Sequence, residues 1–298
     1  MNYTLGLLFA FGYTVTFAAT SVGMRSLSRR LEPFLVVAIR AIVGLMVMVP
    51  LALIVGRDQF HLLTPERLLY LCGSVALGGV LGSACNVYAL KIMGVGRAFP
   101  ITNANPLFTV LFAYLLLGER IEPIMIPGTL LVIAGVYLIS RPRRHSVATI
   151  GEPPLTLQQI LLGTSMALAA ALFWGLNAVI LAPGLKGINP IVANSVRVPT
   201  VAVLSSAIAA LRGEWDAVRG LNRRQVLIFL FIGTVGYAGT STLYVASVQH
   251  IGPSLSAVIG TTAPLFALPL SMALLGERPT RATLLGTLLT IAGILLVI

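Results

Sequence analysis

The sequence predicts an all-α integral membrane protein with ten transmembrane helices, arranged as two inverted five-helix repeats around a central cavity. Three observations support this fold class. Of the 298 residues, 57% are hydrophobic and 10% are charged, whereas a soluble domain carries roughly 25% charged residues. Apolar segments of helix length recur along the whole chain. Finally, ANPLFTVLFAYLLLGER at 104–120 closely resembles TAPLFALPLSMALLGER at 262–278.

The individual spans follow from hydrophobic length, because a helix needs about 20 mostly apolar residues to cross a bilayer. Charged clusters and Pro/Gly clusters separate ten such segments. The expected spans are 3–23, 34–55, 68–90, 96–117, 123–140, 157–181, 189–211, 225–248, 254–275 and 280–298.

The longest polar stretch, RPRRHSVATIGEPPLT at 141–156, is the expected linker between two units. It leaves five spans in residues 1–140 and five in residues 157–298. When the first unit is shifted by 157 or 158 residues, prolines and charged residues of the two units align. The matching pairs are Pro33 and Pro190, Arg40 and Arg197, Pro106 and Pro264, and Glu119 and Glu277.

An odd number of spans per unit inverts the second unit relative to the first, as in many secondary transporters. The basic residues test this topology, since Lys and Arg favour cytoplasmic loops. The connections after the odd-numbered spans hold 14 Lys and Arg residues and the opposite side holds 4. This bias predicts that both termini lie outside. The expected location is the cytoplasmic (inner) membrane, as a multi-pass protein.

Several motifs occur along the chain, most of them in both units. Trp174-Gly175-Leu176-Asn177 lies in the sixth span, an Arg follows a Pro by seven residues in both units, and each unit has a Pro-Leu-Phe helix that ends in Gly-Glu-Arg. In this order the motifs resemble the drug/metabolite transporter superfamily, specifically permeases with two EamA-type domains. The resemblance covers essentially the whole chain. It implies a ten-helix metabolite transporter, often an exporter of amino acids or related compounds, whose spans 1, 3, 4, 6, 8 and 9 line the cavity.

Uncharged polar and aromatic side chains within the spans mark the expected cavity, because such groups are costly against lipid. The candidates for the cavity lining are Asn86, Tyr88, Asn103, Asn105, Trp174, Asn177, Tyr237, Tyr244, Thr261 and Thr262. For any one of them, an interhelical hydrogen bond is the alternative role. Gly78 and Gly82 are expected to allow close helix packing.

Arg40 and Arg197 are the two charges expected inside spans. Intramembrane charges mark functional sites, so these arginines either bind a substrate carboxylate or phosphate, or serve structure and gating. Pro106 and Pro264 are the candidate hinges, because proline weakens a helix locally.

All nine carboxylates fall in loops or at helix ends, which argues against a proton-coupled pump for cationic drugs. Glu119 and Glu277 are expected to complement the helix dipole of the span that follows each of them. No nucleotide-binding fingerprint, catalytic residue or metal-ligand cluster is evident, so no cofactor is expected.

The predicted function is secondary transport, in the direction of export, of small polar metabolites such as amino acids by alternating access. A nucleotide-sugar or lipid-linked phosphate carrier is the alternative. An intramembrane enzyme would need paired catalytic groups at mid-span, and a structural subunit would not need inverted halves. The expected partners are a small-molecule substrate and membrane lipid, not nucleic acid, and the fused halves favour a monomer.

Overall fold

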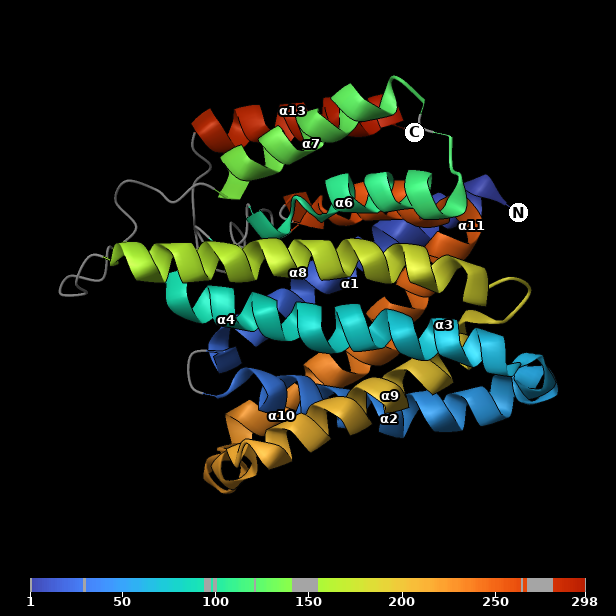
Figure 1. Cartoon of the computed structure of the whole chain (residues 1–298), viewed down its shortest axis with the longest axis vertical. Helices are drawn as coiled ribbons and strands as arrows, with labels where there is room; N and C mark the ends of the chain where they lie inside the picture. The colour runs from blue at the N-terminus through green and yellow to red at the C-terminus, as the bar shows by residue number, and fades with distance from the viewer. Residues whose placement is uncertain are drawn as a thin grey trace.

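The computed structural model describes residues 2–28, 31–93, 98, 101–120, 122–140, 155–263, 265–266 and 281–297. Within these ranges the regular structure is entirely helical (Figure 1). The first half contains α1 (Tyr3–Ser28), α2 (Pro33–Val55), η1 (Arg57–Leu62), α3 (Pro65–Val75), η2 (Ala76–Gly82), α4 (Ser83–Met93), α6 (Asn105–Phe112), η3 (Ala113–Leu117) and α7 (Met125–Ser140). The second half contains α8 (Leu157–Gly184), α9 (Pro190–Leu211), η4 (Glu214–Gly220), α10 (Arg223–Phe231), η5 (Ile232–Thr240), α11 (Ser241–Gly260) and α13 (Arg281–Val297).

Six of the described helical stretches are long and apolar enough to cross a membrane. They are Tyr3–Thr20, Pro33–Val55, Pro65–Met93, Leu157–Gly184, Pro190–Leu211 and Arg223–Gly260. Shorter apolar helices lie at Asn105–Leu117, Met125–Leu138 and Leu284–Val297. The expectation of a multi-pass membrane protein is therefore confirmed. The number ten stays a prediction, because parts of the spans expected at 96–117 and 254–275 lie outside the described residues.

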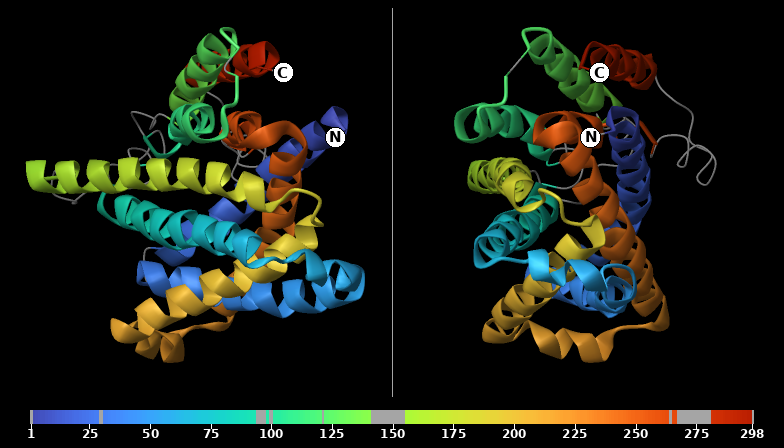
Figure 2. Two further views of the ribbon diagram at one scale, coloured as in Figure 1. Left: turned by 45° about the vertical axis from the view of Figure 1, so that its right-hand side comes forward. Right: turned by 90° about the vertical axis from the view of Figure 1, so that its right-hand side faces the viewer.

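The helices lie side by side, with both ends of the chain at one side of the molecule and the ends of α7 and α8 that flank the linker at the other (Figure 1). α8 packs against α3, η2, α4 and α6, while α2 packs on α9 and α1 packs on α11. α7 and α13 pack on each other and stand together at one end of the molecule (Figure 2).

The α7–α13 contact is antiparallel and depends on glycines. A Cβ on Gly135 would lie 2.5 Å from the Gly286 carbonyl oxygen, and one on Gly293 would lie 2.6 Å from the Gly128 carbonyl oxygen. Gly128 and Gly286 are equivalent positions of the two halves, as are Gly135 and Gly293. Small residues let the two backbones approach closely, which favours helix association in lipid.

Local sequence signals account for several helix starts. Thr156 and Gln159 form a capping box at the start of α8, and Asn222 and Gln225 form one at the start of α10. These pairs satisfy backbone N–H groups that a helix start leaves without intrahelical acceptors. Proline occupies the first turn of α2, α3, α6 and α9, where it has no hydrogen bond to lose.

Two helices are interrupted at equivalent places. Residues 103–104 form a turn in which the Ala104 N–H bonds the Ile101 carbonyl, and residues 261–262 form a turn in which the Thr262 N–H bonds the Ile259 carbonyl. Pro106 therefore lies in the first turn of a new helix, α6, rather than inside a continuous one. The second hinge candidate, Pro264, lies outside the described residues.

Two π-helical segments also occupy equivalent positions, η2 in the first half and η5 in the second. A π-turn changes the hydrogen-bond spacing from four residues to five, and such turns are frequent at functional sites. Both segments are rich in glycine. Glycines of η2 contact Asn177 and Trp174, and Tyr237 of η5 contacts Arg40.

Candidate functional site

A buried arginine organises the polar interior. Arg197 of α9 is 3% exposed. One terminal amino group of its guanidinium, Nη1, donates to Asn194 Oδ1 at 3.1 Å, and the other, Nη2, donates to Asn177 Oδ1 at 3.2 Å. Asn194 reaches the guanidinium because residues three apart share a helix face. Asn177 reaches it from α8.

The two asparagines connect α9 and α8 to α11. Asn194 is fully buried; its Oδ1 also accepts from Ser241 Oγ at 3.0 Å and its Nδ2 donates to Thr242 Oγ1 at 3.4 Å. Asn177 Nδ2 donates to the Tyr244 hydroxyl at 3.3 Å. Three helices therefore contribute to one hydrogen-bonded group around the Arg197 guanidinium. We call this group the Arg197 cluster; its members are Asn177, Asn194, Arg197, Ser241, Thr242 and Tyr244.

The π-helical segment η2 makes room for this cluster. A Cβ on Gly78 would overlap Asn177, and a Cβ on Gly82 would lie 2.9 Å from the Trp174 Cδ1. Trp174 Nε1 donates to the Gly78 carbonyl oxygen at 3.2 Å. Close helix packing was expected at Gly78 and Gly82. Both glycines do pack closely, Gly78 against Asn177 and Gly82 against Trp174 of α8.

Asn194 and Tyr13 were not among the residues expected from the sequence. The Tyr13 ring of α1 meets the edge of the Tyr244 ring at a centroid distance of 5.4 Å, and its hydroxyl donates to the Ser256 carbonyl. A signal for Asn194 was its spacing of three residues before Arg197. Nothing in the spacing of Tyr13 distinguishes it from other aromatic residues of its span.

Arg40 of α2 has different surroundings. Its guanidinium lies 5.0 Å from the centre of the Tyr237 ring, and one amino group is 3.4 Å from both the Tyr237 hydroxyl and Ser83 Oγ. Of the predicted residues, the structure thus places Tyr237 beside Arg40, and Asn177 and Tyr244 in the Arg197 cluster. Trp174 bonds the Gly78 carbonyl in η2, which also contacts Asn177.

Three predicted asparagines carry a buried amide atom with no hydrogen-bond partner among the described residues: Asn86 Oδ1, Asn103 Nδ2 and Asn105 Oδ1. A buried polar atom left unsatisfied costs about 1–3 kcal/mol, so such atoms indicate places for water or a ligand. Thr261 and Thr262 are buried and donate to local carbonyls at 2.7 and 2.6 Å. Asn103 and both threonines lie in the turns that interrupt their helices.

Tyr88 is not part of the Arg197 cluster. Its hydroxyl accepts from Arg212, just beyond the end of α9, at 2.8 Å. Arg212 Nε also lies 2.7 Å from the buried carboxylate of Glu214, whose other oxygen accepts from the Leu35 N–H at 3.0 Å. This group connects the end of α9 to the start of α2.

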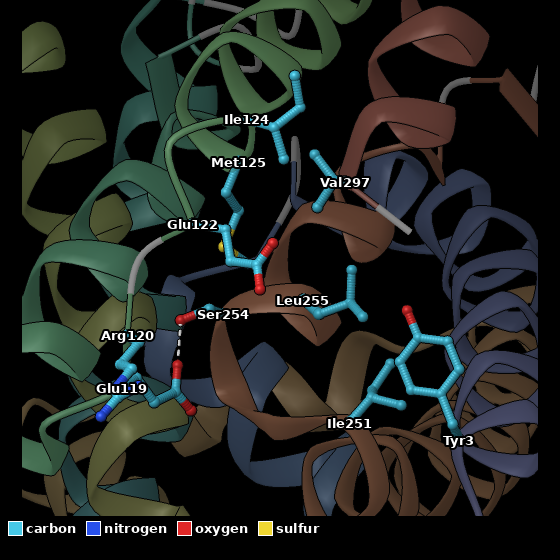
Figure 3. Close-up of a pocket in the computed structure, with 10 residues that line it drawn as sticks. All are labelled: Tyr3, Glu119, Arg120, Glu122, Ile124, Met125, Ile251, Ser254, Leu255 and Val297. Atoms are coloured by element: carbon cyan, nitrogen blue, oxygen red, sulfur yellow. Dashed lines mark hydrogen bonds between the residues drawn. The ribbon is translucent and has the colours of Figure 1, made fainter.

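A separate cavity of about 320 Å³ lies beside the turn between η3 and α7 (Figure 3). On one side of it, Ser254 Oγ donates to Glu119 Oε2 at 2.5 Å, with Arg120 beside Glu119 (Figure 3). Gly252 bends α11 with a φ of 78°, and a Cβ there would lie 3.0 Å from Glu119 Oε1. Burial raises the pKa of Glu119, which the Ser254 hydrogen bond partly offsets. Glu119 therefore contacts the other half of the chain at this bend, in addition to preceding α7; Glu277 lies outside the described residues.

The sequence profile of the EamA-like transporter family matches residues 4–141 and again residues 161–298. The chain belongs to the EamA-like transporter family. The resemblance inferred from the repeated motifs is thus confirmed, and the family indicates a transporter rather than an enzyme.

Individual relatives agree with this assignment. Human solute carrier family 35 member G1 is 30% identical over 222 residues, which are 73% of this chain and 60% of the human protein. An uncharacterized transporter of Clostridium kluyveri is 24% identical over 97% of this chain and 91% of its own length. A solved structure described only as "Crystal structure of protein" shares the fold, with a TM-score of 0.75 at 19% identity, covering 99% of this chain and 98% of its own.

Proposed function

We propose that this protein is a secondary transporter that moves small polar metabolites, with amino acids as the leading class, across the cytoplasmic membrane by alternating access. The Arg197 cluster carries the proposal. It gathers polar side chains from three apolar helices, where each would be costly against lipid. The family membership supports transport in general; the amino-acid class is what the family resemblance implies, and the buried polar cluster is compatible with it.

Two halves of opposite orientation around one site give a simple route to alternating access, and contacts that occur twice support such halves here. Gly44 and Val201 are equivalent positions of the two halves, as are Gly79 and Tyr237. A Cβ added to Gly44 would contact Tyr237, and a Cβ added to Gly79 would contact Val201. The antiparallel α7–α13 pair has the same twofold character. We infer two inverted units, residues 1–140 and 157–298, joined by the linker 141–156.

The interrupted helices support a binding site between the two units. In many secondary transporters, discontinuous helices surround the substrate at the repeat interface. Here the turns at residues 103–104 and 261–262 interrupt one helix of each unit. The surplus of basic residues on the side of the linker supports an orientation with the linker in the cytoplasm and both termini outside.

Extracellular metabolite profiling tests the proposal. Cells expressing the unaltered protein are compared by mass spectrometry with cells expressing an Asn177→Leu, Tyr244→Leu variant at matched membrane abundance. We expect specific amino acids to accumulate outside only with the unaltered protein. Equal profiles would remove the support for amino-acid export, and phosphate-bearing or lipid-linked cargo would then be tested.

A further inference from the structure

We propose that the Arg197 cluster binds the carboxylate of the transported molecule, so that the substrates are carboxylic acids and zwitterions and not simple amines. This inference rests on the proposed transport function and adds the chemical group that the site recognises.

The first support is the missing counter-ion. The described carboxylates of the chain lie in loops or at helix ends, and none is within ion-pair distance of Arg197. Among the described residues the guanidinium hydrogen-bonds only to neutral groups, the amide oxygens of Asn194 and Asn177. A charge this deeply buried is costly unless an opposite charge accompanies it. A substrate anion supplies that charge.

The second support is a free donor. Arg197 Nε is fully buried and donates to no group among the described residues. Nε and a neighbouring amino group of a guanidinium form a fork that matches the two oxygens of a carboxylate. The Tyr244 hydroxyl is nearby, since Asn177 bonds both side chains; it accepts from Asn177 and donates no hydrogen bond to any described residue. An anion at this place therefore finds donors from both Arg197 and Tyr244.

The two intramembrane arginines differ in their aromatic contacts and in their burial. Arg40 lies over the Tyr237 ring, whose face partly stabilises a cation. No aromatic face within the described residues stacks on Arg197. Arg197 is also the more buried of the two. The anion site is therefore assigned to Arg197.

The decisive variant is Asn194→Asp, which keeps the side-chain shape and places a carboxylate 3.1 Å from the guanidinium. If the site binds anions, the new carboxylate neutralises the positive charge of Arg197. The substrate anion is then excluded while the fold is kept. Asn222→Asp is the matched control, because Asn222 caps α10 and Asp is an equally good cap. Arg197→Gln is a second variant, but it can fail to fold, and Asn194→Asp avoids that difficulty.

Binding is measured as thermal stabilisation of the purified protein in detergent. The probes are L-leucine, N-acetyl-L-leucine, which keeps the carboxylate, L-leucinamide, which lacks it, and inorganic phosphate. We expect stabilisation by the two carboxylates and not by leucinamide. In Asn194→Asp the unliganded protein should be more stable, and the apparent Kd for carboxylates should rise roughly ten- to hundredfold, as for the loss of charge-assisted hydrogen bonds.

Three results would overturn the inference: stabilisation by leucinamide equal to that by leucine, an unchanged carboxylate response in Asn194→Asp, or no stabilisation by any carboxylate. Stabilisation by phosphate alone would replace the carboxylate with a phosphate group as the recognised chemistry. Carboxylate binding without transport in any assay would refute the proposed transport function, while the carboxylate site would remain supported. Transport of leucinamide by both the unaltered protein and Asn194→Asp would refute the carboxylate site, while the proposed transport function would remain supported.

Discussion

Gly78→Ala is the substitution that tests most sharply how helix packing positions the cluster. Gly78 lies in η2 and faces Asn177 of α8, whose Oδ1 accepts from Arg197. An added Cβ would overlap the Asn177 Cβ and lie 2.7 Å from its Cγ. The Cβ of Asn177 is attached directly to the backbone, so α8 itself must move.

The size of the effect follows from the geometry. Ordinary contact begins at 3.4 Å, so the Asn177 Cγ must retreat by at least 0.7 Å (3.4 minus 2.7). The Asn177–Arg197 bond is already 3.2 Å, so a shift of that size away from Arg197 takes it beyond hydrogen-bond range. Overpacking of this kind costs about 1–3 kcal/mol, which corresponds to a fall of roughly 2–12 °C in unfolding temperature for a protein of this size.

The assay is the unfolding temperature in detergent, together with amino-acid export at matched abundance. Gly73→Ala is the control, because Gly73 lies in the same span and a Cβ there has no atom within 4 Å. In a helix interior, alanine is favoured over glycine by about 1 kcal/mol, so this control should be unchanged or more stable. Equal unfolding temperature and export for the two variants would refute the account of the site.

Three further substitutions test other contacts. Burial raises the pKa of Glu119, so its ionisation lowers stability as the pH rises from the ordinary value of 4.5 through the raised one; Glu119→Gln should reduce the fall in unfolding temperature over that window, and an unchanged pH profile would contradict the assignment. Gly135→Ala would place a Cβ 2.5 Å from the Gly286 carbonyl oxygen and should cost about 1–3 kcal/mol by separating α7 from α13; thermal unfolding at the native value would show that the two helices are not in this contact. The Glu214 carboxylate is 4% exposed with both oxygens bonded, whereas the Asp216 ion pair is exposed; Glu214→Gln should lower the unfolding temperature while Asp216→Asn should not, and equal effects would contradict the difference in burial.

The positions of the helices could be predicted because hydrophobic length and capping residues are local. The span expected at 157–181 is the helix Leu157–Gly184, and its start is recognisable from Thr156 and Gln159 as a capping box. The span expected at 34–55 is the helix Pro33–Val55, which starts at a proline.

The partners of the polar residues could not be predicted, because hydropathy does not show how a fully apolar helix is rotated. Asn194 is buried and holds Arg197, yet its span contains other polar residues with an equal claim. Tyr88 was grouped with the cavity residues by composition, but its partner Arg212 follows a helix that is distant in sequence.

The π-helical segments could not be predicted from the sequence either. The five-residue spacing has no hydrophobic signature, and the glycines of η2 are equally compatible with a normal packing face. The contact of Glu119 with the bend at Gly252 joins positions 133 apart, and no local pattern predicts it.

Counterflow in proteoliposomes tests the central claim most directly. Purified protein is reconstituted, the vesicles are loaded with unlabelled amino acids, and uptake of the same amino acids in labelled form is measured, with Asn177→Leu, Tyr244→Leu vesicles as the control. The account predicts transient accumulation of at least one labelled amino acid in the vesicles with the unaltered protein and none in the control. Uptake no greater than in protein-free vesicles across the set would contradict it.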